Sequence, residues 1–188
     1  MKRQKWTLPL AGVLLAVGMA AGGTLAWLLA ESDTVTNTFT TSDITVTLHE
    51  TTGTTYKMVP GYTLAKDPKV TVTQGSEKCY VFVTLEKSEN FNEFLTYEMA
   101  EGWTLLGGES DVFYRVVDTA DMGSPISVLK DDCVSVLETV TKEAMNDLPE
   151  ESQPTLTVTA YAAQYNKNAT EFFTAAEAWT LLSKDSTF

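Results

Sequence analysis

Few side chains in this sequence have the types and spacing that catalysis requires. His49 is the one histidine, and the residues after it read Glu-Thr-Thr-Gly. A zinc peptidase of the HExxH class needs a second histidine one helical turn later. A serine hydrolase of the elbow type needs Gly-x-Ser-x-Gly around its nucleophile. Neither pattern occurs in the sequence. We therefore predict that the chain is not an enzyme and holds no catalytic metal and no cofactor.

The clearest chemical prediction from the sequence is that the chain is itself cleaved by a signal peptidase. Lys2, Arg3 and Lys5 precede an uncharged run over residues 6–30. A basic start, an apolar helix and small residues at its exit are typical of an export signal. Thr24 and Ala26 fit the small-x-small rule for cleavage. We predict a signal peptide over residues 1–26 and Trp27 as the first residue of the mature protein.

An uncleaved membrane anchor is the alternative reading of the same segment. A run of 25 uncharged residues, from residue 6 to residue 30, can cross a hydrocarbon core of ~30 Å as a helix. Basic residues before the run place the rest of the chain outside the cell in either case. We therefore expect export through the Sec pathway and an extracellular or cell-surface location.

Charge and cysteine content narrow the classes of partner. The formal net charge is −12, which argues against binding to nucleic acid, because phosphates are neutralised by basic surfaces. The two cysteines, Cys79 and Cys133, lie in strand-like apolar runs, where thiols are usually inert. An exported chain also permits a disulfide. A disulfide between Cys79 and Cys133 and a pair of free thiols both remain open.

The rest of the sequence is typical of an all-β protein. Apolar residues alternate with Thr or Ser over residues 44–48, 69–73, 133–140 and 154–162, which predicts strands. Residues 79–85 are apolar on both faces, so we expect a central strand covered on both sides. Residues 103–106 and 112–117 flank Gly107-Gly108 and predict a hairpin. No linker divides residues 27–188, which predicts one domain, a jelly-roll-like β-sandwich.

A few short helices are expected beside the strands. Residues 91–95 and 141–148 have helical patterns, and Pro149 ends the second. Thr174 and Glu177 have the spacing of a capping box, which predicts the start of a C-terminal helix. Asn168 and Glu171 offer a competing start one turn earlier. Phe172, Ala176 and Trp179 are spaced for one helical face, with Leu182 close to it.

The predicted mature N-terminus begins with three large apolar residues, Trp27, Leu28 and Leu29. Such residues are costly to expose at a free end. They either pack on the core of their own subunit or cover a partner. The Thr- and Val-rich residues that follow could add as a strand to the open sheet edge of another subunit.

Two groups of residues resemble a known family. Residues 22–27, GGTLAW, and residues 35–39, VTNTF, resemble the exit region of SipW-dependent signal peptides, which has a GGT-x-A element followed by N-x-F. Residues 59–61, 66–72, 79–83 and 156–164 resemble strands of Gram-positive proteins of the TasA and camelysin (CalY) type. The resemblance covers nearly the whole chain.

The resemblance implies a structural role in a biofilm matrix. Members are cut by a dedicated signal peptidase of the SipW type, fold as jelly rolls and polymerise by donating an N-terminal strand. Carried over here, residues 27–39 are the donor segment, with Trp27, Leu28, Leu29, Val35 and Phe39 as its apolar positions, and the partner is another copy or a related matrix subunit. A tethered or secreted adhesin is the alternative function. A secreted metal-dependent peptidase is weaker still, because the sequence lacks HExxH.

Overall fold

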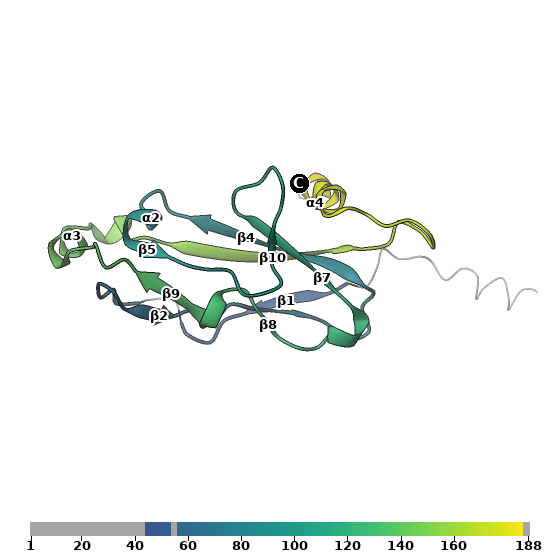
Figure 1. The fold of residues 1–188 in the computed structure, drawn as a ribbon, viewed down its shortest axis with the longest axis horizontal. Helices are drawn as coiled ribbons and strands as arrows, with labels where there is room; N and C mark the ends of the chain where they lie inside the picture. The colour runs from purple at the N-terminus through teal and green to yellow at the C-terminus, as the bar shows by residue number, and fades with distance from the viewer. Residues whose placement is uncertain (1–43, 54–55, 186–188) are drawn as a thin grey trace, which may run out of the picture. The chain divides into compact units, whose positions relative to one another are not determined.

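The computed structural model describes residues 44–53 and 56–185, which all belong to one compact unit, Ser42–Phe188 (Figure 1). Strands dominate this part of the chain, and the helices are short. The strands are β1 (Val46–His49), β2 (Thr63–Ala65), β3 (Lys69–Val72), β4 (Cys79–Lys87), β5 (Leu95–Thr96), β6 (Thr104–Leu105), β7 (Val112–Val117), β8 (Ile126–Ser127), β9 (Cys133–Val136) and β10 (Leu156–Gln164). The α-helices are α2 (Phe91–Phe94), α3 (Lys142–Asn146) and α4 (Ala175–Asp185). The prediction of an all-β protein with a few short helices is confirmed.

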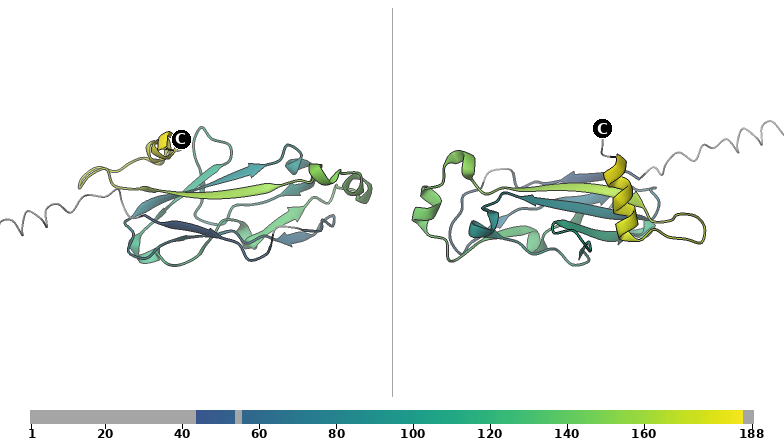
Figure 2. Two further views of the ribbon diagram at one scale, coloured as in Figure 1. Left: turned by 180° about the vertical axis from the view of Figure 1, so that it is seen from behind. Right: turned by 90° about the horizontal axis from the view of Figure 1, so that it is seen from above.

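Every strand pairing described is antiparallel. The strands form a four-stranded sheet in the order β10-β4-β7-β6 and two smaller sheets in the orders β1-β3-β8 and β2-β9-β5. Residues 66–68 connect β2 directly to β3, so the two smaller sheets continue one another along the same side of the molecule. The main apolar core lies between them and the four-stranded sheet (Figures 1 and 2).

The central strand β4 separates two apolar cores. Cys79, Val81, Val83 and Leu85 face the main core. Tyr80 and Phe82, on the opposite face, belong to a second core beneath α4. The alternation follows from the period of two residues in a strand. The predicted central position of residues 79–85 is confirmed, since β10 pairs with one edge of β4 and β7 with the other.

Helix α4 covers the outer face of the four-stranded sheet (Figure 2). The predicted capping box is present: the Thr174 N–H donates to Glu177 Oε2 at 2.8 Å, and the Glu177 N–H donates to Thr174 Oγ1 at 3.2 Å. Trp179 packs on Phe82, with ring centroids 5.2 Å apart. The Tyr80 hydroxyl donates to the Phe173 carbonyl at 2.8 Å and fixes the segment that leads into the helix.

Three details of the predicted elements are wrong. The buried face of α4 is formed by Ala175, Ala178, Trp179 and Leu182 rather than by Phe172 and Ala176, because the chain becomes helical only after Thr174. Phe172 precedes the helix and is 55% exposed. Strand β9 ends at Val136 instead of residue 140. The Leu137 N–H still donates to the Phe94 carbonyl, but the Val140 N–H then closes a turn on the Leu137 carbonyl.

Acid should loosen α4 through Glu177. The hydrogen bond from Lys167, 2.7 Å away, and then those from Thr174 lower the pKa of this carboxyl to about 2. The ionised carboxylate stabilises the folded protein because its pKa is lower there than in the unfolded chain, where it is ~4.3. This stabilisation is complete above pH ~4.3 and is lost as pH falls toward the pKa of the folded protein. We expect Glu177→Gln to flatten the acid-induced change in tryptophan fluorescence between pH ~4.5 and ~2. Glu143→Gln, on an exposed turn of α3, is the control, and identical acid profiles for all three proteins would contradict the prediction.

Candidate apolar groove

A cavity of about 440 Å³ opens at the end of the main core near α2. Its apolar lining comes from core residues of different elements. These are Met58 after β1, Leu64 of β2, Phe91 of α2, Leu95 of β5, Val134 of β9 and Leu156 of β10. Phe91, Leu95 and Val134 are at most 8% exposed. Tyr56, Lys66, Gln153 and Thr155 form the polar part of the lining, and Pro154 adds to the apolar part. We call this cavity the apolar groove.

Two unpaired strand edges border the groove. Among the described strands, β2 pairs only with β9, and β10 pairs only with β4. Leu64 of β2 and Leu156 of β10 line the groove from the two opposed sheets. In the neighbouring stretch the equivalent edge is covered, because β1 pairs with β3 along four residues. The groove therefore lies where the described part of the molecule lacks an edge strand beside β2.

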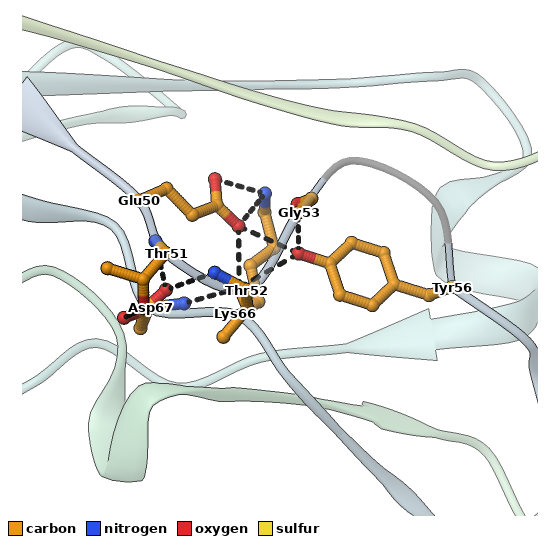
Figure 3. A network of polar contacts seen from close by, with 7 residues as sticks. All are labelled: Glu50, Thr51, Thr52, Gly53, Tyr56, Lys66 and Asp67. Atoms are coloured by element: carbon orange, nitrogen blue, oxygen red, sulfur yellow. Dashed lines mark hydrogen bonds and ion pairs between the residues drawn. The ribbon is translucent and has the colours of Figure 1, made fainter.

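A polar network holds the loop after β1 at the mouth of the groove (Figure 3). Lys66 Nζ lies 3.1 Å from both carboxylate oxygens of Glu50. The Tyr56 hydroxyl lies 2.8 Å from Glu50 Oε1 and 2.6 Å from the Gly53 carbonyl. Burial raises the pKa of the Tyr56 phenol, and the hydrogen bond and charge of Glu50 raise it further. The phenol therefore stays protonated at neutral pH and donates its one proton within this network.

Asp67 fixes the first turn of the same loop. Its Oδ1 accepts from the Thr51 N–H at 2.8 Å and the Thr52 N–H at 3.0 Å, and its Oδ2 accepts from the Thr51 hydroxyl at 2.6 Å. Hydrogen bonds from Thr51, more than any other cause, lower the pKa of Asp67 well below its ordinary range. Because Asp67 directly follows Lys66, adjacent residues between β2 and β3 bind both parts of the loop.

The lining of the groove is mostly apolar. No histidine, cysteine or serine is among the residues that line the groove. Its tyrosine and lysine are both engaged in the loop network. What the groove offers is apolar surface between two strand edges, which fits an extended segment with apolar side chains at alternate positions.

No family model, no curated protein and no solved structure matches this chain.

Of the sequence-predicted site residues, those within the described part of the chain do not line the groove. Thr24, Ala26, Trp27, Leu28, Leu29, Val35 and Phe39 fall outside the described residues. His49 ends β1 opposite Lys69 and is exposed. No cluster of ligating side chains suited to a metal ion occurs among residues 44–53 and 56–185. Within the same residues, no helix has the length and apolar character needed to cross a membrane.

Cys79 and Cys133 are free thiols, so the structure does not contain the disulfide that the sequence left open. Cys79 lies at the beginning of β4, opposite Gln164 and Val117, whereas Cys133 begins β9 opposite Ala65. Burial raises the pKa of the Cys79 thiol to about 11. A thiol with so high a pKa is a poor nucleophile at neutral pH.

Sequence reasoning missed the groove. Tyr56 and Lys66 belong to no recognisable chemical motif, and nothing in the spacing of the apolar lining residues indicates that they come together. The difference in length between β10 and β2 could have indicated the groove. Strand β10 is a long alternating run, whereas β2 has three residues and is too short to cover the whole edge of a sheet.

Proposed function

We propose that this chain is an exported structural subunit of extracellular fibres, and that residues 27–39 of one copy add as a strand to the apolar groove of the next. The observation that carries the proposal is the groove itself, an apolar cavity between the free edges of β2 and β10. Main-chain groups at open edges bind an added strand through backbone hydrogen bonds, and pockets for alternate side chains provide specificity.

The proposed donor segment has the length and pattern that the groove needs. Thirteen extended residues span at most ~45 Å. Val35 and Phe39 lie an even number of residues apart, so both side chains point to the same face of an extended strand. Lys66 at the mouth of the groove is already paired with Glu50. Apolar contact and main-chain hydrogen bonds, rather than new ion pairs, would therefore provide most of the affinity.

The connectivity supports a jelly-roll-like β-sandwich as the finer description of the fold. Strands β3 and β4 are consecutive but belong to opposed sheets, and the chain crosses again between β4 and β5, between β5 and β6, between β7 and β8 and between β9 and β10. Repeated crossing between two antiparallel layers is the hallmark of Greek-key sandwiches. The resemblance of the signal region to SipW-dependent precursors supports cleavage after Ala26 and an extracellular location.

A charge placed in the groove tests the proposal. Met58 is half-buried and lines the groove, whereas its neighbour Val59 is 46% exposed and does not. Both Met58→Glu and Val59→Glu add one carboxylate in the same loop. We expect Met58→Glu to raise the protein concentration needed for fibre formation at least about tenfold, since burying an unpaired carboxylate costs well over 1.4 kcal/mol.

Sedimentation and electron microscopy of the processed protein provide the measurement. Val59→Glu should assemble like the unmodified protein. Equal assembly of both variants would mean that the groove is not the acceptor. Assembly lost in Val59→Glu alone would place the contact on the outside of the loop instead.

A further inference from the structure

Arg115 stands apart from the other cations of the described chain. It is the one arginine among residues 44–53 and 56–185, and it interrupts an otherwise uncharged strand, VFYRVV. In β7 it lies opposite Val81, on the face that contributes to the main core. It also lines a second cavity, of about 330 Å³, together with Glu101, Asp121 and residues 124–127.

The guanidinium group is held in a defined position. A Cβ built on Gly102 would lie 3.3 Å from Cζ and from both terminal nitrogens of Arg115, so the guanidinium stacks flat against the glycine. Arg115 Cζ also lies 5.7 Å from the centre of the Trp103 ring. Trp103 is itself fixed, because its Nε1 donates to the Ser127 carbonyl at 2.9 Å. Gly102 has a φ of 90°, which favours glycine and keeps this face open for the guanidinium.

Its hydrogen-bonding capacity is nevertheless unused. Arg115 Nε is buried and has no acceptor among the described residues. The ion pairs of this part of the chain are all formed by lysines: Lys66, Lys69, Lys78, Lys87, Lys130 and Lys167. A buried donor without a partner is costly to a folded protein. The terminal nitrogens of Arg115 take part in none of the ion pairs just named, and they are the donors left for a ligand in the cavity. An arginine fork matches the geometry of a carboxylate, which accepts two parallel hydrogen bonds.

We propose that the cavity beside Arg115 binds a carboxylate, which accepts hydrogen bonds from the two terminal nitrogens of this side chain. Glu101 and Asp121 are exposed at the same cavity. Their charges oppose multiply charged anions, so a singly charged carboxylate is favoured over phosphate. The carboxylate comes either from a small molecule or from the C-terminus or an acidic side chain of a peptide. The site is distinct from the apolar groove, since the two share no lining residue.

The Nε–Hε resonance of Arg115 belongs to the same guanidinium group as the proposed donors and is sensitive to a carboxylate bound at its terminal nitrogens. The full chain contains two arginines, Arg3 and Arg115, so ¹⁵N spectra of the full chain in uncharged detergent micelles contain two such signals. Arg115→Gln assigns them, and Arg3→Gln assigns them equally if the first variant does not fold. Propionate should shift the Arg115 signal downfield and saturate it below about 10 mM, whereas propionamide at the same concentration should leave it unchanged.

A peptide ligand and variants of Arg115 test where the carboxylate comes from and whether the arginine fork holds it. A short N-acetylated peptide with a free C-terminus should bind more tightly than propionate if the natural ligand is a peptide, and its amidated form should not bind. Arg115→Lys should weaken binding about tenfold or more, because lysine keeps the charge and loses the fork. Lys142→Gln, an exposed cation of α3, should bind normally. An Arg115 signal that ignores every carboxylate, or follows phosphate and propionate equally, would overturn the proposal.

Discussion

Deleting residues 27–39 from the mature protein is expected to abolish fibre formation and leave a folded, soluble monomer. Both apolar cores are filled by side chains of described elements, among them β3, β4, β7, β9 and α4. The deletion leaves these packing contacts in place. Electron microscopy should show no fibres, and circular dichroism should retain the β-sheet signal.

A matched variant distinguishes the sequence of the segment from its length. Replacing residues 27–39 with thirteen Gly and Ser residues keeps the reach of the chain and removes the apolar side chains. We expect this variant to remain monomeric as well, because register is set by the apolar pattern, and a slip of one residue turns Val35 and Phe39 away from the acceptor. Unchanged fibres from the deleted protein would show that strand donation is wrong. Failure of the deleted protein to fold would place the segment in the core of its own subunit.

Phe82→Ala should lower the free energy of unfolding by about 3–5 kcal/mol, the usual cost of emptying a buried aromatic site. Phe82 is 0% exposed. Its ring packs between Tyr80, Tyr114 and Trp179, at centroid distances of 6.0, 6.2 and 5.2 Å. The cavity would open between the sheet and α4, so the helix should also lose much of its attachment.

Chemical denaturation measures this loss, and Phe172→Ala is the control. Phe172 is the same residue type, contacts Tyr165 at 5.2 Å and is 55% exposed. Its truncation should cost less than about 1 kcal/mol. A loss below about 1 kcal/mol for Phe82→Ala as well would mean that α4 does not seal the second core in solution.

The sequence predicted elements whose signal is local. The two-faced apolar run of β4 indicated a central strand, and Thr174 with Glu177 marked the start of α4, because a cap is satisfied within one turn. Trp179 and Leu182 were predicted correctly on the buried face of α4, whereas Phe172 and Ala176 were placed there wrongly. Small residues, Ala175 and Ala178, meet the sheet there, and a pattern based on large side chains overlooks them.

The apolar groove could not be predicted from the residues of β2. It exists because no second described strand pairs with β2. Pairing between strands distant in the sequence decides which edges stay open, and alternation within a strand carries no such information. The sequence does show Arg115 as a charged residue within an otherwise apolar strand. Its lack of a partner became evident only from the tertiary packing around Gly102 and Trp103.

The two faces of β4 differ in bulk. One carries Cys79, Val81 and Val83, and the other carries Tyr80 and Phe82, yet all five residues are at most 7% exposed. In most sheets a shift by one residue is prevented because it would bury polar side chains. Here both faces of β4 are apolar. A shift of one residue would force aromatic rings into space shaped for valine and would leave voids beneath α4. Overpacking and cavities both destabilise a core. Alignment of β4 with β10 and β7 is thus enforced by side-chain size, so exchanging the residue sizes of the two faces should produce misaligned sheets without any change in hydrophobicity.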